Sequence, residues 1–128
     1  MSGPRLFSIL RQGHILIASI HTALDDAQLQ RFHEDLVEQI GRNRARGVII
    51  DVAALDVVDS YATRTLRDIA GVARLRGART VVVGIQPDVA FVMVQLGMDT
   101  GSLVTALDLE EGLAHLTDRV GVPSGLPR

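Results

Sequence analysis

Cysteine, lysine and tryptophan are all absent from this chain of 128 residues. Without cysteine the chain can form no disulfide, thiolate metal site or thiol nucleophile. Without lysine it can form no Schiff base, and it lacks the lysine of a phosphate-binding P-loop. All thirteen basic residues are therefore arginine. These absences exclude several classes of covalent and nucleotide-hydrolysing enzyme.

Aromatic residues and clustered positive charge are also scarce. One tyrosine and three phenylalanines are too few for a platform on which bases could stack. The net charge is −2, and the arginines are dispersed apart from the local cluster of Arg42, Arg44 and Arg46. A nucleic-acid footprint needs clustered positive charge, so we expect no nucleic-acid partner.

Long apolar runs are missing too, although the chain is apolar overall. No run reaches the roughly 18 residues that a membrane span needs, and the opening "MSGPRLF" lacks the pattern of a secretory signal. We expect no membrane partner and a cytoplasmic location. Apolar residues nevertheless make up 47% of the chain, with a mean hydropathy of +0.24. This excess predicts a protein–protein contact surface.

Enzyme motifs do not occur in the sequence: there is no G-x-G-x-x-G, G-x-S-x-G or H-E-x-x-H. One enzyme alternative stays open, a small phosphate-metabolising enzyme with Asp51, Asp56 and Asp59 around Mg²⁺. The missing lysine, phosphate loop and general base disfavour it, and we expect no enzymatic activity, cofactor or metal. The histidines are scattered without ligand spacing, and we expect structural roles for all four: His14, His21, His33 and His115.

Short apolar runs alternate with amphipathic segments along the chain. The order predicts an α/β fold, a mostly parallel mixed sheet of about five strands packed with about four helices, with the first hairpin as an antiparallel edge. We expect one domain over 1–120 and a flexible tail over 121–128. The expected strands are 7–10, 14–20, 48–55, 80–85 and 103–107, and the expected helices begin near Asp25, Ser60, Pro87 and Asp108.

Some details of these elements are also predicted. The strand over 14–20 is apolar nearly throughout, which is typical of a strand covered on both faces. The third helix is expected to continue through Leu96 to a stop at Gly97. The inward residues expected on the last helix are Leu109, Leu113, Leu116 and Val120.

The stretch "LDVVDSYATRTL" places an acid and a serine together at an expected helix start. A helix cap needs only one such residue, and Asp59 can fill that role. Ser60 is then left with its hydroxyl facing solvent, beside the carboxyl end of a buried strand where α/β sheets tend to place their sites. Two interpretations follow, a plain cap or an exposed switch.

The segment "GVIIDVAALDVVDSYATRTL", with "RGARTVVVGIQPDVAFVMVQLGM" and "TALDLEEGL", resembles the STAS domain family of anti-sigma-factor antagonists and stressosome subunits. Together the D-S pair, "GIQP" and the short N-terminus are most similar to the small S-type stressosome subunits. The larger R-type paralogues carry an N-terminal sensor domain, which we expect this chain to lack. They also carry a phosphorylated threonine in the third helix, where this chain has Val92 and its apolar neighbours.

The resemblance implies a scaffold and regulatory subunit of a stress-response pathway. It implies that Ser60 is phosphorylated by a switch serine kinase of the GHKL fold, which the unphosphorylated domain sequesters, and that a phosphatase resets the serine. It also implies homo-oligomers and hetero-oligomers with an R-type paralogue in a large assembly. The expected kinase-facing residues are Asp59, Ser60, Tyr61 and Thr63.

Other interpretations of the same residues remain. Thr63 is otherwise expected to be an ordinary residue of the helix surface, and Thr63 or Thr65 is the alternative phosphate acceptor. Ser102 and Thr105 are expected to be structural. The alternative function is a simple anti-sigma-factor antagonist that acts through a sigma-sequestering kinase.

Overall fold

The computed structural model describes residues 6–95 and 103–117. These residues form one five-stranded sheet in the order β1-β2-β3-β4-β5, in which only the β1–β2 pair is antiparallel. The predicted mixed sheet with four helices is confirmed. The elements are β1 (Phe7–Gln12), β2 (Ile15–Ile20), α1 (Asp26–Asn43), β3 (Gly47–Asp51), α2 (Ser60–Leu75), β4 (Arg79–Val83), α3 (Pro87–Gln95), β5 (Val104–Ala106) and α4 (Leu109–Leu116).

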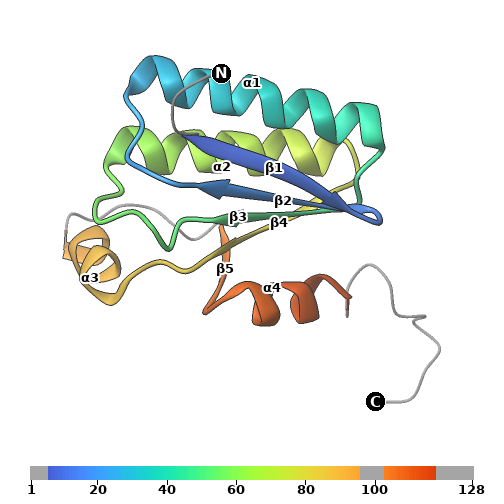
Figure 1. The fold of residues 1–128 in the computed structure, drawn as a ribbon. Coiled ribbons are helices and arrows are strands. Elements are labelled where there is room, and N and C mark those ends of the chain that lie inside the picture. The colour runs from blue at the N-terminus through green and yellow to red at the C-terminus, as the bar shows by residue number, and fades with distance from the viewer. Residues whose placement is uncertain (1–5, 96–102, 118–128) are drawn as a thin grey trace.

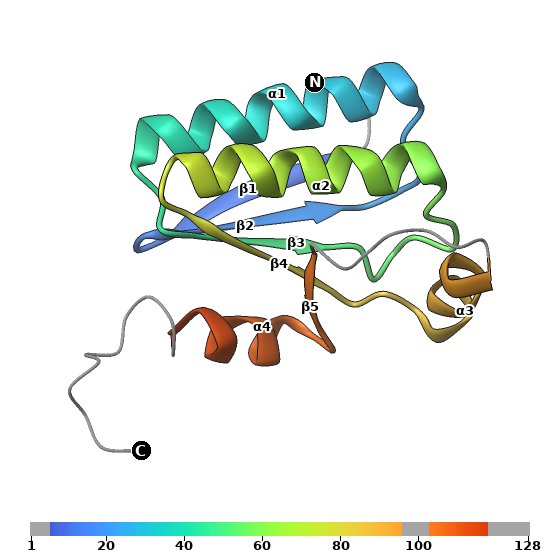
Figure 2. The ribbon, with the colours of Figure 1, turned by 180° about the vertical axis from the view of Figure 1, so that it is seen from behind.

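The helices lie on the two faces and at one end of the sheet. α1 and α2 lie side by side on one face, α4 covers part of the other, and α3 lies beyond the carboxyl ends of the strands (Figure 1). Figure 2 shows the same layers from behind. The crossovers from β2 to β3 and from β3 to β4 step the same way across the sheet, so their right-handedness puts α1 and α2 on one face.

The larger core lies between the sheet and the helices α1 and α2. The stripe at Phe32, Leu36 and Ile40 is fully buried against side chains of β2 and β3. The ring of Phe32 meets that of Phe7 edge to face, with centroids 5.1 Å apart. The 3.6-residue period of α1 therefore predicted its buried face correctly.

A smaller core lies under α4 on the second face. Leu116 packs on Ile49, Val81 and Val83. A Cβ added to Gly112 would lie 2.7 Å from Cγ1 of Val83, so this helix approaches the sheet closely because that position has no side chain. α4 leaves the second face of β2 half-buried, and the expectation that this strand is covered on both faces is wrong.

Two further expectations about the elements are corrected. The strand predicted over 48–55 ends at Asp51, because the chain turns at Val52, where the amide of Leu55 donates to the Val52 carbonyl at 3.0 Å. Leu109 is 38% exposed and does not face inward, since it is the first residue of its helix. The predictions for Leu96, Gly97, Ser102, Val120 and the tail lie outside the described residues.

Aspartates cap three of the helices. Asp25 forms a capping box with Gln28, and Asp59 and Asp108 each accept a backbone amide three residues later. The expected caps at Asp25 and Asp59 are confirmed. No helix within the described ranges is long and apolar enough to cross a membrane.

Candidate functional site

The segment between β3 and α2 brings the predicted serine to the carboxyl edge of the sheet. Leu55 and Val58 are buried and anchor this loop. Val57, which lies between these two residues in the sequence, is 66% exposed. The loop thus holds a fixed path over the core while it presents an apolar side chain to solvent next to the helix start.

Asp59 alone caps α2. Its Oδ1 accepts the amide of Ala62 at 2.8 Å, and its carbonyl accepts the amide of Thr63 at 2.9 Å. Ser60 is the first helical residue and is exposed. Its hydroxyl is therefore not the helix cap, and the sequence-based assignment of the cap to Asp59 is correct.

The loop after β4 supports the loop that carries the serine. Gln86 donates from Nε2 to the carbonyl of Ala53 at 2.7 Å. Gly84 has a φ of +83°, and a Cβ there would lie 2.8 Å from that of Ala53. Only glycine suits both this backbone conformation and this close approach, so the two loops pack as one rigid edge.

Ser60 lies at a cavity of about 440 Å³ between its loop and α3. Three exposed carboxylates line the cavity beside the serine, those of Asp56, Asp59 and Asp88. Val57 and Val92 add apolar walls, and no arginine or histidine of the described residues lines it. The serine hydroxyl is thus set in acidic and apolar surroundings.

Sequence reasoning missed the contribution of α3 to this cavity. Asp88 follows a strand and a proline, which marks a helix start at the same edge of the sheet as Ser60. That placement was available from the predicted order of strands, since the carboxyl ends of parallel strands meet at one edge.

The two threonines that follow the serine are buried. Thr63 is only 3% exposed, and its Oγ1 donates to the backbone carbonyl of Asp59 at 3.0 Å. Thr65 is 8% exposed, and its Oγ1 donates to the backbone carbonyl of Tyr61 at 2.9 Å. The expectation that Thr63 lies on the helix surface is wrong. It sits three residues before the buried Leu66, so it shares the inward stripe of α2.

The remaining predicted site residues are at the same edge but do not form a metal centre. Tyr61 is half-buried on the first turn of α2. Asp51 is occupied by a hydrogen bond, since its Oδ1 accepts the amide of Ala53 at 2.9 Å. Within residues 6–95 and 103–117 no group of three or more acidic, histidine or cysteine side chains could hold a metal ion. The magnesium alternative therefore has no ligand set in this part of the chain.

Exposed apolar side chains also lie along α3, of which Val92 lines the cavity at Ser60. Phe91, Val92 and Val94 are all at least half exposed, and only Val89 and Met93 of this helix are buried. We name these three exposed side chains, together with Val57 of the loop that carries Ser60, the α3 patch. The apolar excess of the composition lies in part here, and two of the four residues, Val57 and Val92, line the cavity at Ser60.

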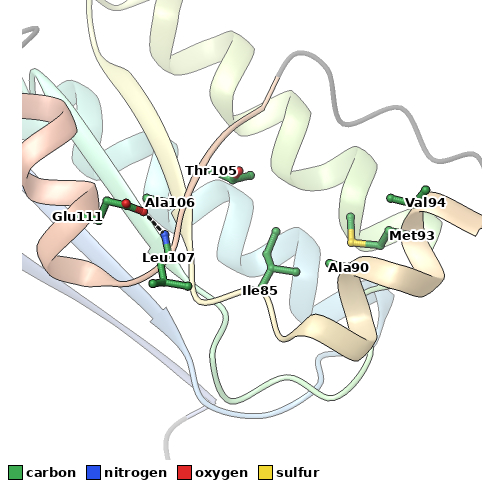
Figure 3. Close-up of a pocket in the computed structure, with 8 residues that line it drawn as sticks. All are labelled: Ile85, Ala90, Met93, Val94, Thr105, Ala106, Leu107 and Glu111. Atoms are coloured by element: carbon green, nitrogen blue, oxygen red, sulfur yellow. Dashed lines mark hydrogen bonds between the residues drawn. The ribbon is translucent and has the colours of Figure 1, made fainter.

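A second cavity, of about 430 Å³, lies between α3 and the start of α4. In Figure 3, α3 lines it with Ala90, Met93 and Val94, and β5 and α4 line it from the other side. Its one carboxylate, Glu111, accepts the backbone amide of Leu107. The cavity is mainly apolar, and its polar side chains are those of Thr105 and Glu111.

Comparison with known proteins adds to this geometry. The family model for the STAS domain matches residues 7–112. A serine-to-glutamate variant of RsbS from Moorella thermoacetica is 34% identical, covers 90% of this chain and 97% of its own, and superposes with a TM-score of 0.77. A solved structure described as the molecular architecture of the stressosome, a signal integration and transduction hub, is 31% identical over 90% of this chain and all of its own, with a TM-score of 0.71.

A longer relative matches as well. The RsbT co-antagonist protein RsbRA of Bacillus subtilis is 28% identical over 115 residues, or 88% of this chain. The chain spans only 42% of that relative's length.

Proposed function

The chain belongs to the STAS domain family, and on that premise we propose that it is a non-catalytic regulatory subunit of a stressosome-type assembly. In this proposal the unphosphorylated domain holds a switch serine kinase of the GHKL fold, and phosphorylation of Ser60 releases it. A phosphatase then resets the serine.

One observation carries the proposal: Ser60 is exposed at a helix start that Asp59 already caps. The hydroxyl is therefore not needed to cap the helix. The relatives of the chain include stressosome proteins. A phosphate at Ser60 would lie at a helix N-terminus, which favours an anion by about 0.3–1 kcal/mol. The fold should therefore tolerate the modification.

The surroundings explain how a phosphate would act on a partner. A phosphoserine adds about −1.5 to −2 charges at pH 7, next to the carboxylates of Asp56, Asp59 and Asp88. Like charges about 4 Å apart near a protein surface repel by up to about 4 kcal/mol before salt screening. The phosphate therefore points outward, into any partner that covers the α3 patch.

Such repulsion is large enough for a switch. Juxtaposed like charges across an interface cost several kcal/mol, and each 1.4 kcal/mol is about tenfold in affinity. A held kinase would become a free one without any catalytic group on this chain. We propose that Tyr61, Asp59 and the α3 patch contact the kinase around Ser60.

The test is phosphate transfer from radiolabelled ATP by the switch kinase of the same organism. We expect label on the wild type and on a control, Thr22→Ala, which removes an exposed hydroxyl outside the site. We expect none on Ser60→Ala, whose fold should be intact because Ser60 is not the cap. Equal label on Ser60→Ala, or no label on any of the three chains, would contradict the proposal.

A further inference from the structure

The end of the sheet opposite to Ser60 holds a second polar cavity. It measures about 350 Å³ and is lined by Arg74 of α2 and by Arg79 and Thr80 of β4, with the small side chains of Ala70 and Ala78. We name it the arginine cavity. It opens because β5 pairs only with Val81–Val83, so the first two residues of β4 extend beyond the strand that covers its edge.

The polar side-chain groups of the arginine cavity have no partners among the residues that the structure describes. Thr80 is only 8% exposed, yet its Oγ1 forms no hydrogen bond within the described part of the chain. Arg74 and Arg79 are exposed and form no ion pair with any described residue. A buried hydroxyl without a partner is costly to the fold. Arg74 and Arg79 line the same cavity as Thr80, so an anion held there by the two guanidinium groups would lie next to this residue.

The surroundings of the cavity are also basic. The amino ends of the parallel strands meet here, and the amide of Arg79 donates to the carbonyl of Arg46 at 3.1 Å. Arg76 lies with its guanidinium against Gly41 of α1. Glu38 of α1 is engaged by Arg42 at 2.6 Å. Asp68 of α2 lines another cavity together with Arg74, and no acid among the described residues forms an ion pair with Arg74 or Arg79.

One effect opposes an anion at this end. The C-terminus of α2 carries a partial negative charge of about half an elementary charge. Its last carbonyls are already satisfied, since the amides of Arg76 and Gly77 donate to Ala73 and Arg74 at 2.9 and 3.0 Å. Two full positive charges outweigh this partial charge, and the net field favours an anion.

We propose that the arginine cavity binds a phosphate monoester. Two guanidinium groups match the double charge of such a ligand, and their planar forks donate two hydrogen bonds each to its oxygens. The Thr80 Oγ1 is sealed from solvent, and a rotation of this side chain toward the cavity lets its hydroxyl donate to a further oxygen and gain its missing partner. The alanine walls leave room at this point of the helix–strand contact, where a larger side chain would fill the space.

The ligand does not come from Ser60 of the same chain. Ser60 and Arg74 are fourteen residues apart on one helix, which is about 21 Å along its axis. The phosphate group has two possible sources, a free phosphate-bearing small molecule or a phosphoserine on another chain. The acidic cavity at Ser60 and the basic end of a second copy are complementary in charge. The proposal that the arginine cavity binds a phosphate monoester does not depend on which kinase, if any, modifies Ser60.

The first experiment titrates the ¹⁵N-labelled full chain with inorganic phosphate at constant ionic strength and follows the arginine Nε–Hε resonances by NMR. We expect saturable shifts of Arg74 and Arg79 that chloride does not produce. The double variant Arg74→Gln with Arg79→Gln should weaken binding at least about tenfold, and Thr80→Val, which keeps the shape, should weaken it about threefold. The control Arg64→Gln removes an exposed arginine of α2 outside the cavity and should change nothing.

The second experiment separates the two sources. A chain made with phosphoserine at position 60 is measured by analytical ultracentrifugation. Self-association that inorganic phosphate competes away, and that Arg74→Gln with Arg79→Gln abolishes, assigns the ligand to a second chain. Phosphate binding without self-association assigns it to a free small molecule. If neither saturable phosphate binding nor self-association occurs, or if Arg64→Gln weakens binding as much as the double variant, the proposal is overturned.

Discussion

At the scale of single residues, Asp59 and Ser60 divide two tasks that one residue often performs. Asp59 satisfies the amide of Ala62 at the start of α2, and Ser60 next to it remains exposed. The sequence could predict this division, because a cap requires one acceptor and the pair offers two. It could not predict that Thr63 is buried without weighing the register of α2, whose inward stripe begins one turn earlier than the apolar residues indicate.

The cap gives the first prediction at this scale. Asp59→Ala should lower the free energy of unfolding by about 1 kcal/mol, because the amide of Ala62 loses its acceptor. Asp56→Ala removes a neighbouring exposed carboxylate that caps nothing and should change stability by less than about 0.5 kcal/mol. Urea unfolding of the three chains makes the comparison, and equal losses in both variants would refute the assignment of the cap.

The glycine between the two loops gives the second prediction. Gly84→Ala should destabilise the fold by about 1–3 kcal/mol, because the new Cβ meets that of Ala53 at a φ of +83°. The control is Gly71→Ala on α2, where nothing lies within 4 Å of an added Cβ. There alanine should stabilise the helix by about 0.5–1 kcal/mol. Thermal unfolding measures both variants. Melting temperatures that shift in the same direction for the two variants would show that the close approach of Gly84 to Ala53 does not stabilise this edge.

At the scale of elements, the helix α3 could be predicted from the sequence, but its position beside the serine cavity could not. Its start at Pro87 was predictable, since proline is favoured in the first turn. Its part in the serine cavity depends on the contact of two loops distant in sequence, which the period of apolar residues does not encode. The order of the nine described elements was predictable for the opposite reason, because each strand is a short, largely apolar run and most helices carry a local period of their own.

The exposed face of α3 gives the third prediction. Phe91→Ser should weaken binding of the kinase at least about tenfold, because an exposed aromatic side chain on the helix that lines the serine cavity is the type of residue that anchors interfaces. Leu75→Ser is the control, an 87% exposed leucine at the far end of α2. Surface plasmon resonance compares the two, with urea unfolding to verify that both fold. Equal affinities would show that the kinase does not bind the α3 patch.

At the scale of the whole molecule, the fold separates charge along the strands. Helices begin at the carboxyl ends of the strands with capping aspartates and end at the amino ends, where Arg44, Arg74 and Arg76 gather. This polarity follows from the parallel arrangement together with the favoured ends of the helix dipole. The parallel order of the strands and the charged residues at the helix ends could both be predicted from the sequence. The arginines are dispersed along the chain, however, and they come together only because neighbouring parallel strands place the ends of α1 and α2 next to each other.

Assembly gives the fourth prediction. Mixed with an R-type STAS paralogue, the chain should enter a particle on the order of a megadalton, because its relatives include stressosome proteins. Size-exclusion chromatography with light scattering measures the mass. A mixture that stays small would contradict this prediction and favour the alternative, a simple anti-sigma-factor antagonist.

The central claim, that Ser60 is a switch for a held kinase, is tested most directly by one affinity. The dissociation constant of the switch kinase is measured by calorimetry for the unmodified chain and for the chain with phosphoserine at position 60. We expect tight binding to the unmodified chain and an affinity at least about a hundredfold weaker for the phosphorylated chain, since about 2.8 kcal/mol of repulsion suffices. Equal affinities for the two chains would show that Ser60 is not such a switch.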